Sequence, residues 1–402
     1  MQTTMNVALG DLQNALAQVR PCVANSAGDI TSHYVFRPHE SDGVAVHGWS
    51  GKTFAFAPIN GTTYDGVDAF TIEAKRLDQW LSTLNDTAVI QFDYDEGKVS
   101  ATAPRGKIVF QSLDPASFPW WDQLWASANE TGKVRANQLR MAINHSRPFM
   151  SDDDTKNPKL CVVECIEGTL RCTDLTAMCQ TAVPGMEGVT VRLHGKDLGA
   201  VNSFLALQSD GEVTVYESDR AQFFASLDGK GAVFGESRPN AQFPKVGVDD
   251  SYTEMWELGR EELLTAIKFL VAGASWDDNT LAIERDGETV TLSMDDCSGE
   301  EVLTQTVESK IEHKCEDDNF GFQISRLHFQ RLLGLCNEDK VILRSTRREN
   351  AGWITVVEEP VDGFKFATAI TWMFARQKTT SVNTNVTAGV TNKDTTTVEV
   401  SA

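Results

Sequence analysis

The chain has 402 residues, 41% of them hydrophobic, and a formal net charge of −21 from 36 basic and 57 acidic residues. At about 150 residues per domain, this length allows two to four domains, each with its own core. A protein that binds nucleic acid over much of its surface usually carries net positive charge, so the acidic balance argues against such binding. A DNA-binding role would require the positive charge to be gathered in one place.

The start of the chain, Met1 to Leu9, has neither a charged segment nor a long apolar run. No stretch reaches the roughly 18 apolar residues that span a membrane. The eight cysteines include no C-x-x-C pair, and the spacing of Cys161, Cys165, Cys172 and Cys179 fits neither a zinc ribbon nor a known disulfide pattern. We therefore expect a cytoplasmic protein with reduced thiols, no metal, no cofactor and no membrane contact.

Three segments share one helical pattern, with apolar or small residues at i, i+3, i+4 and i+7, which is one face of an amphipathic helix. The pattern begins at Leu12, Leu139 and Leu263, at offsets of 127 and 124 residues. Arg20-Pro21 recurs as Arg147-Pro148, again 127 residues on, and proline ends a helix of this kind.

Each segment continues in the same order, with a second helix, a strand and an apolar closing strand. The second helices are predicted at 75–84, 196–207 and 325–335, the strands at 88–92, 212–216 and 340–343, and the closing strands at 108–113, 222–227 and 365–370. An ordered pattern that repeats about every 125 residues predicts three copies of one α+β unit.

The repeat sets the expected domain limits. We expect domains at 1–130, 131–255 and 256–375, with linkers near 120–132 and 246–257. Residues 376–402 are rich in Thr, Asn and Val and predict a flexible tail, with an additional strand as the alternative.

The positive charge is concentrated in the six predicted helices, which carry ten basic and five acidic residues. The rest of the chain is therefore more acidic than the whole. This division suits a ring in which helices line a hole and attract phosphates at short range, while strands form the acidic outside. The alternative is that these cations lie on ordinary solvated helix faces.

The order of these elements resembles the bacterial DNA polymerase III beta subunit, the sliding clamp, from residue 1 to about 374. The most specific stretches are 71–102, then Ser112-Leu113-Asp114-Pro115-Ala116-Ser117-Phe118-Pro119, which resembles the exit from the family's first domain, and Leu170-Arg171-Cys172-Thr173-Asp174, which resembles its Leu-x-x-x-Ala-Thr-Asp. The resemblance implies three clamp domains per chain and a head-to-tail ring of two chains, with helices around a central hole and antiparallel sheets outside.

In such a ring, double-stranded DNA is held without sequence specificity, and the chain is not an enzyme. The resemblance implies DNA contacts from the helix cations, Arg20, Lys75, Arg76, Arg140, Arg147, Lys196, Lys268, Arg326 and Arg331. It places the homodimer contact at Ile108 and Phe110 of one chain and at Val271 and Ala272 of the other.

The replicative polymerase and the clamp loader would insert short peptides into an apolar groove between the second and third domains. The matching positions are Pro158, Thr173, Leu175, Met178, Pro244, Val248, Thr368, Ile370 and Trp372, and each is also a candidate for ordinary core. The chain departs from the family at Leu175-Thr176-Ala177, where Gly-His-Arg is usual, and at Ile370-Thr371-Trp372-Met373, where the family ends Met-Pro-x-Arg-Leu. These departures from the family sequence would suit a phage-encoded member of the family.

Two alternatives remain open. A hydrolase would need convergent ionisable groups, yet none of the seven histidines has another at i+4, no phosphate-binding glycine loop occurs, and Ser151-Asp152-Asp153-Asp154 is expected to be a solvated loop. A virion or scaffold protein built from repeated β units would form a larger assembly without affinity for primed DNA.

Overall fold

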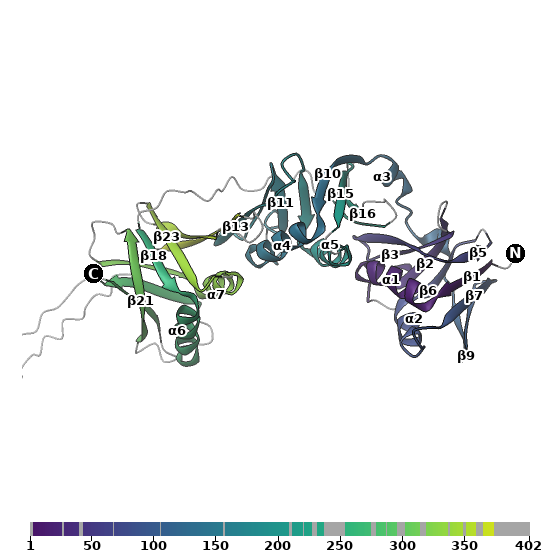
Figure 1. Ribbon diagram of the computed structural model, residues 1–402, viewed down its shortest axis with the longest axis horizontal. Coiled ribbons are helices and arrows are strands. Elements are labelled where there is room, and N and C mark those ends of the chain that lie inside the picture. The colour runs from purple at the N-terminus through teal and green to yellow at the C-terminus, as the bar shows by residue number, and fades with distance from the viewer. Residues whose placement is uncertain are drawn as a thin grey trace, which may run out of the picture.

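The computed structural model describes residues 3–373 with internal gaps. The residues outside the description are 1–2, 26–27, 40–42, 67, 105, 156, 209–210, 220, 227–230, 237–253, 275–278, 287, 296–301, 314–318, 337, 349–350, 359–364 and 374–402. Three similar α+β units follow one another in an arch, with the helices along the concave side and the sheets across the outside (Figure 1).

Each unit repeats one order of elements. The first comprises β1 (Thr3–Ala8), α1 (Leu9–Val19), β2 (His33–His39), β3 (Gly43–Trp49), β4 (Phe54–Ile59), β5 (Thr63–Asp65), β6 (Phe70–Glu73), α2 (Ala74–Leu81), β7 (Val89–Asp95), β8 (Lys98–Ala103) and β9 (Gly106–Gln111). A short helix, α3 (Asp122–Ala126), lies in the segment that leads to the second unit.

The second unit comprises β10 (Asn129–Arg135), α4 (Ala136–Ser146), β11 (Val162–Ile166), β12 (Thr169–Thr173), β13 (Ala177–Ala182), β14 (Val191–His194), α5 (Gly195–Leu207), β15 (Glu212–Glu217), β16 (Ala221–Ser226) and β17 (Ala232–Glu236). The third comprises β18 (Glu254–Gly259), α6 (Arg260–Gly273), β19 (Thr280–Asp286), β20 (Thr289–Asp295), β21 (Val302–His313), β22 (Asn319–Ser325), α7 (Arg326–Leu335), β23 (Lys340–Arg348), β24 (Ala351–Glu358) and β25 (Lys365–Met373).

The three amphipathic helices form where the spacing predicts them. In each, the apolar positions are buried, as for Leu12, Leu139 and Leu263, which are all fully buried. The Arg-Pro pairs end α1 and α4 as expected, and each pair begins a 3-10 turn, η1 (Arg20–Cys22) and η4 (Arg147–Phe149). Arg20 and Arg147 therefore lie just after the α-helices, in these turns.

One strand prediction was wrong. The sequence predicts that residues 222–227 form the closing strand of the second unit, but residues 222–226 belong to β16, which is followed by β17, and Leu227 lies outside the described residues. The Phe-rich composition of β16 resembles that of β9, although β16 is the middle strand of its meander. The expected limits at residues 130 and 255 also fall inside β10 and β18, so limits a few residues earlier would keep each strand whole.

The units are joined by strand pairing across their boundaries. β17, which closes the second unit, pairs antiparallel with β4, the fourth strand of the first unit, and Phe234 lies opposite Phe54. β25, which closes the third unit, also pairs antiparallel with β13, the fourth strand of the second unit. The closing strand of one unit thus completes the sheet of the unit before it, and both internal boundaries are continuous sheets.

An aromatic cluster covers the outer face of the first of these boundaries. Trp121, 5% exposed, comes from the connecting segment and lies with its ring centroid 4.8 Å from that of Phe56 on β4 and 5.6 Å from that of Phe234 on β17. His47 is enclosed in the same cluster, and burial lowers its pKa to about 3, so that it is neutral there. The connecting segment therefore holds the two units together from outside.

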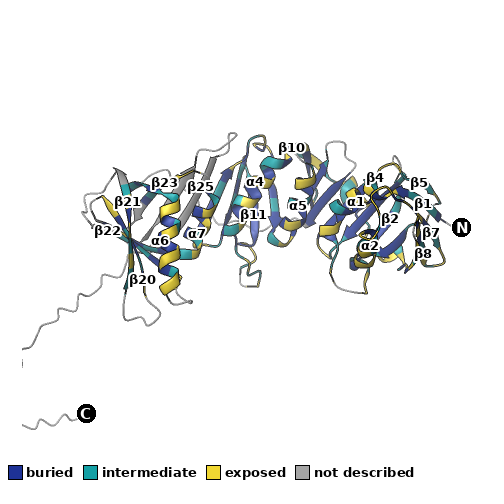
Figure 2. Ribbon diagram, turned by 60° about the horizontal axis from the view of Figure 1, so that its bottom comes forward, coloured by how far each residue is buried: buried dark blue, intermediate teal, exposed yellow. Residues whose placement is uncertain are grey.

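The helices form one row inside the arch, in the order α2, α1, α5, α4, α7, α6. Helices α4 and α5 pack together within the second unit, and α5 meets α1 and η1 across the first boundary, while α7 meets η4 across the second. Figure 2 shows exposed residues along the faces of these helices that point away from the sheets. No helix in the described ranges is long and apolar enough to span a bilayer.

Replacing Trp121 by alanine removes the side chain that touches both β4 and β17. We expect Trp121→Ala to lower the free energy of unfolding by about 3–5 kcal/mol, because a large buried aromatic residue is lost and leaves a cavity. Urea unfolding followed by circular dichroism measures this change. The neighbouring Asp122→Ala, which breaks only a surface ion pair with Arg37, should cost less than about 1 kcal/mol.

Candidate nucleic-acid interface and partner groove

Five of the predicted DNA-facing cations are exposed on the inner helix row and form no ion pair with another described residue. They are Lys75 and Arg76 on α2, Arg140 on α4, Arg147 in η4 and Lys268 on α6. Because Lys75, Arg140, Arg147 and Lys268 are exposed on elements of three units that lie along the concave side (Figure 1), they can meet a single polyanion without rearrangement of the fold. Arg76 instead lies over the Phe110 ring of β9.

Two further cations on this face already have carboxylate partners. Arg20 donates two hydrogen bonds to Asp78 of α2, both 2.9 Å, and Tyr34 donates to the same carboxylate at 3.2 Å. The bond to Asp78 raises the pKa of Arg20. Lys196 donates to Asp154 at 3.0 Å, which holds the pKa of Asp154 at about 2. Both cations are more than half exposed, but their charge is partly neutralised within the chain.

The last two predicted cations lie on α7. Arg326 donates to Gln330 at 3.3 Å, and Arg331 donates to the carbonyl oxygen of Pro148 at 3.0 Å. Since Pro148 belongs to η4, the Arg331 bond crosses from the third unit to the second. The structure thus gives Arg331 a role at the domain boundary that the sequence pattern did not indicate.

Asp174 and His328 form the centre of this second boundary. Asp174 Oδ1 accepts hydrogen bonds from the backbone N–H groups of Thr176 and Ala177, both 2.8 Å, and its Oδ2 lies 2.8 Å from His328 Nε2. Burial alone would raise the pKa of Asp174, but the bonds from His328 and the backbone outweigh burial and hold it below the usual value. The charge of Asp174 is therefore used to join α7 to the turn between β12 and β13.

The predicted partner groove is partly brought together beside this turn. Leu175 is 57% exposed and has a φ of 76°, a left-handed conformation that costs a leucine about 1–3 kcal/mol. Thr173 is buried and its hydroxyl is bonded within the turn, to Ala177 O at 2.7 Å, while Met178 is also buried. Leu175 is thus the apolar side chain that the turn presents to solvent.

The other groove positions divide into three groups. Pro158 is exposed in the loop before β11. Thr368 and Ile370 lie on β25, opposite Cys179 and Ala177 of β13, and Trp372 lies two residues further on, so the strand pairing brings this part of β25 to the turn. Pro244 and Val248 lie outside the described residues, as do the side chains of β25.

The first boundary uses a different polar contact, which the sequence analysis did not find. Thr53, just before β4, donates from its hydroxyl to Asp197 of α5 at 2.6 Å, and both residues are buried. Gly235 of β17 lies against Asp197, where a Cβ atom would come within 2.7 Å of the carboxylate. No local motif marks either residue, because they are 144 positions apart.

The residues expected at the dimer contact lie at the two ends of the arch. Ile108 and Phe110 are on β9, which pairs only with β8 among the described strands, but Phe110 is buried in its own core and Val109 is the exposed residue. Val271 and Ala272 are at the end of α6, next to Gly273, where a Cβ atom would meet Leu303 of β21 at 2.8 Å. Both places therefore lie beside a strand segment with a partner on one side only among the described strands, β9 and residues 302–308 of β21.

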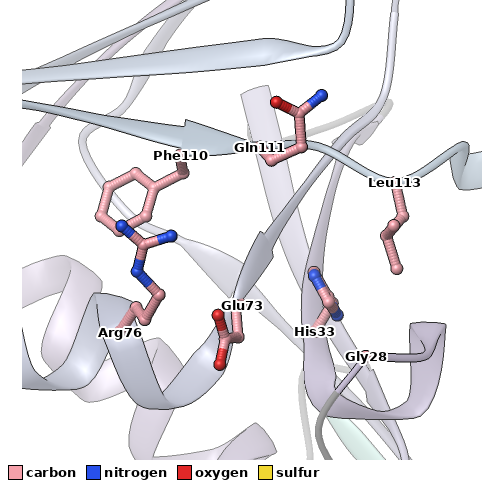
Figure 3. Close-up of a pocket in the computed structure, with 7 residues that line it drawn as sticks. All are labelled: Gly28, His33, Glu73, Arg76, Phe110, Gln111 and Leu113. Atoms are coloured by element: carbon pink, nitrogen blue, oxygen red, sulfur yellow. The ribbon is translucent and has the colours of Figure 1, made fainter.

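A cavity of about 310 Å³ opens between β9 and the start of α2. Figure 3 shows Arg76, Glu73, His33 and Phe110 around it. The Arg76 guanidinium lies 5.7 Å from the centre of the Phe110 ring. Among the described residues, no three His, Cys, Asp or Glu side chains are placed to hold a metal ion.

No family model matches the sequence, and no curated protein sequence is significantly similar to it. Solved structures do match over nearly the whole chain. The DNA polymerase III subunit beta of Pseudomonas aeruginosa superposes with a TM-score of 0.79 and 15% identity, covering 92% of this chain and 99% of its own. The sliding clamp of the same organism bound to griselimycin superposes with a TM-score of 0.78 and 15% identity, covering 93% of this chain and 100% of its own. The sliding clamp of Caulobacter crescentus superposes with a TM-score of 0.77 and 15% identity, covering 92% of this chain and 100% of its own. The chain therefore has the sliding-clamp fold.

The Asp174–His328 contact predicts a pH dependence of stability. Because the folded pKa of Asp174 is below its unfolded value of about 3.9, the contact contributes fully at neutral pH and is lost as the pH falls through the folded pKa. We expect Asp174→Asn to destabilise the protein at pH 7 and to have a smaller effect near pH 3. Urea unfolding of both proteins at the two pH values measures this; an equal loss at both would contradict it.

Proposed function

We propose that this protein is a DNA sliding clamp, a processivity factor that encircles duplex DNA and tethers the replicative polymerase. The observation that carries the proposal is the single row of helices inside the arch, with exposed cations on an otherwise acidic chain. Cations that touch phosphates hold DNA without reading its sequence. The proposal assigns no catalytic residue and places the protein in the cytoplasm with the replication machinery.

Ring closure is supported by the strand pairing inside the chain. At both internal boundaries, the closing strand of one unit pairs with the fourth strand of the unit before it. At the ends of the arch, β9 pairs only with β8 among the described strands. Residues 302–308 of β21 pair only with β20 among the described strands, because β18 pairs with residues 309–313. Two chains joined head to tail would pair β9 of each with residues 302–308 of the other and give both the partner that the internal boundaries have.

The same repeat identifies residues for this contact. Val109 of β9 corresponds to Phe234 of β17, which lies opposite Phe54 at the start of β4. Val302, at the start of β21, corresponds to Phe54, so the proposed register sets Val109 opposite Val302. Phe269 of α6 corresponds to Gln18 of α1, which lies beside Gly231 at the first boundary. Phe269 is 59% exposed, and a head-to-tail contact would give this side chain a place to bury.

The function that follows is topological. A closed ring cannot leave a duplex sideways, and weak phosphate contacts let it slide. A polymerase bound to the ring stays near its primer terminus at high effective concentration. We propose that the polymerase and the clamp loader bind through short peptides at the groove beside Leu175, where an exposed apolar side chain is held in a strained turn.

Retention on circular DNA tests this function. We expect the protein, loaded on a nicked circular plasmid, to remain bound through gel filtration and to be released when a restriction enzyme linearises the plasmid. Linear DNA with both ends blocked by bulky proteins is the control and should retain it. Release from circular and linear DNA at the same rate would contradict the proposal and favour a scaffold role.

The exposed inner cations predict a salt-dependent contribution to DNA binding. Replacing both Arg140 and Arg147 by alanine should weaken binding and reduce the slope of log K against log salt by up to about 2, since each lost phosphate contact lowers it by about 0.9. Fluorescence anisotropy with a duplex at several salt concentrations measures the slope. Arg37→Ala, a cation paired with Asp122 near the connecting segment, is the matched control and should leave it unchanged.

A further inference from the structure

The first two units place a cation at the same two positions of the inner helix row. Arg20 and Arg147 are each the first residue of the 3-10 turn that follows the first helix of the unit. Lys75 and Lys196 are each the second residue of the second helix of the unit. Because the two units repeat one arrangement of positive charge, the surroundings of each cation can be compared position by position.

The surroundings of the two arginines differ at the fifth residue of the second helix. In α2 this residue is Asp78, whose two carboxylate oxygens each accept a hydrogen bond of 2.9 Å from Arg20. In α5 it is Gly199, and Arg147 forms no ion pair with another described residue. The residue before this position is a fully buried leucine in both helices, which fixes the alignment. The first unit therefore supplies a carboxylate where the second unit has none.

The two lysines show the opposite division. Lys196 donates to Asp154 at 3.0 Å, and the same carboxylate lies 3.2 Å from Nε2 of His194, the residue before α5. His194 is buried and therefore fixes Asp154 beside the lysine. In the first unit, Lys75 is exposed and forms no ion pair with another described residue. Each of these units thus has one cation held by a carboxylate and, at the other position, one that no described carboxylate holds.

A cation held in this way is a poor ligand for phosphate. The two bonds to Asp78 occupy Nε and Nη2 of Arg20, a pair of donors that could bind a phosphate in the same bidentate manner. Tyr34 donates a further bond of 3.2 Å to Asp78 and keeps the carboxylate in place. A phosphate that displaced this carboxylate would leave it without its cation and next to a second anion, so the exchange gains little.

We propose that Asp78 and Asp154 withhold Arg20 and Lys196 from the DNA backbone and so set how tightly the inner face holds a duplex. The inference rests on the proposed clamp function and deepens it. One of the two equivalent cations in each unit then contacts phosphate at full strength, and the other contributes less to the release of counterions from DNA. Asp78 and Asp154 are positioning residues, because they act on DNA only through the cation that each one holds.

Removing either carboxylate should strengthen DNA binding. We expect Asp78→Asn and Asp154→Asn each to steepen the plot of log K against log salt by up to about 0.9, the value for one added phosphate contact. Fluorescence anisotropy of the full chain with a duplex at several salt concentrations measures this slope. Asp122→Asn makes the same change of net charge at the surface partner of Arg37. It is the matched control and should leave the slope unchanged.

The reverse change can be made at Gly199. A Cβ atom there would meet nothing within 4 Å, so a side chain fits. By the repeat, an aspartate at this position would lie beside Arg147 as Asp78 lies beside Arg20. We expect Gly199→Asp to make the slope shallower by up to about 0.9, and Gly199→Asn, which matches it in size without the charge, to leave the slope unchanged. In an Arg147→Ala background, Gly199→Asp should have little further effect, because the cation that it would hold is gone.

The outcomes separate this inference from the proposed function. Slopes that Asp78→Asn and Asp154→Asn leave unchanged would overturn the inference, and so would an effect of Gly199→Asp that persists without Arg147. A purely structural role of the Arg20–Asp78 pair would lower the stability to urea and leave the slope as it is. A wild-type chain that leaves circular and linear DNA at the same rate would instead overturn the clamp function. Circular dichroism confirms that each variant is folded before its slope is used.

Discussion

The architecture of this protein depends on one requirement, which is that an edge strand of a sheet needs a hydrogen-bonded partner. An unpaired edge exposes backbone donors and acceptors and invites uncontrolled association. Here each unit offers its fourth strand to the next unit and closes with a strand that pairs with the fourth strand of the unit before it, as β17 does for β4 and β25 for β13. This pairing occurs at both internal boundaries and leaves β9 and residues 302–308 of β21 without it among the described strands. The proposed ring would repeat the pairing at every boundary between units.

This constraint also bears on how an acidic protein could hold DNA, as the proposed function requires. When sheets form the outer layer, the helices are left on the concave side (Figure 1), and exposed cations lie on these helices. Several cations are already bonded within the chain, such as Arg20 to Asp78 and Lys196 to Asp154. In the proposed clamp, the inner surface would attract phosphate through a few exposed residues, which suits a contact that slides along DNA.

Periodicity in the sequence was enough to predict the three α+β units, the six long helices and the ends of α1 and α4 at Arg-Pro. These features depend on local spacing, which a single sequence displays. The closing strand of the second unit was misplaced because β16 and β17 are both apolar, and only their partners distinguish them. Polar contacts such as Thr53–Asp197 were not predictable, since each residue is unremarkable alone. The role of Arg331 was likewise hidden, because its partner, a backbone carbonyl, has no sequence signal. At the groove, the family resemblance pointed to Leu175, but neither it nor the sequence pattern could reveal the left-handed backbone of this residue.

The measurement that tests the ring most directly is a cross-link between its proposed edges. Val109→Cys and Val302→Cys, introduced together, place one thiol on β9 and one on β21, at positions that lie opposite each other in the register taken from Phe234 and Phe54. The native cysteines in the described ranges are buried. The account predicts that a short bis-maleimide converts the double variant to a species of twice 44.2 kDa, whereas neither single variant reacts in this way. A double variant that stays monomeric, or that joins into long polymers, would contradict the closed two-chain ring.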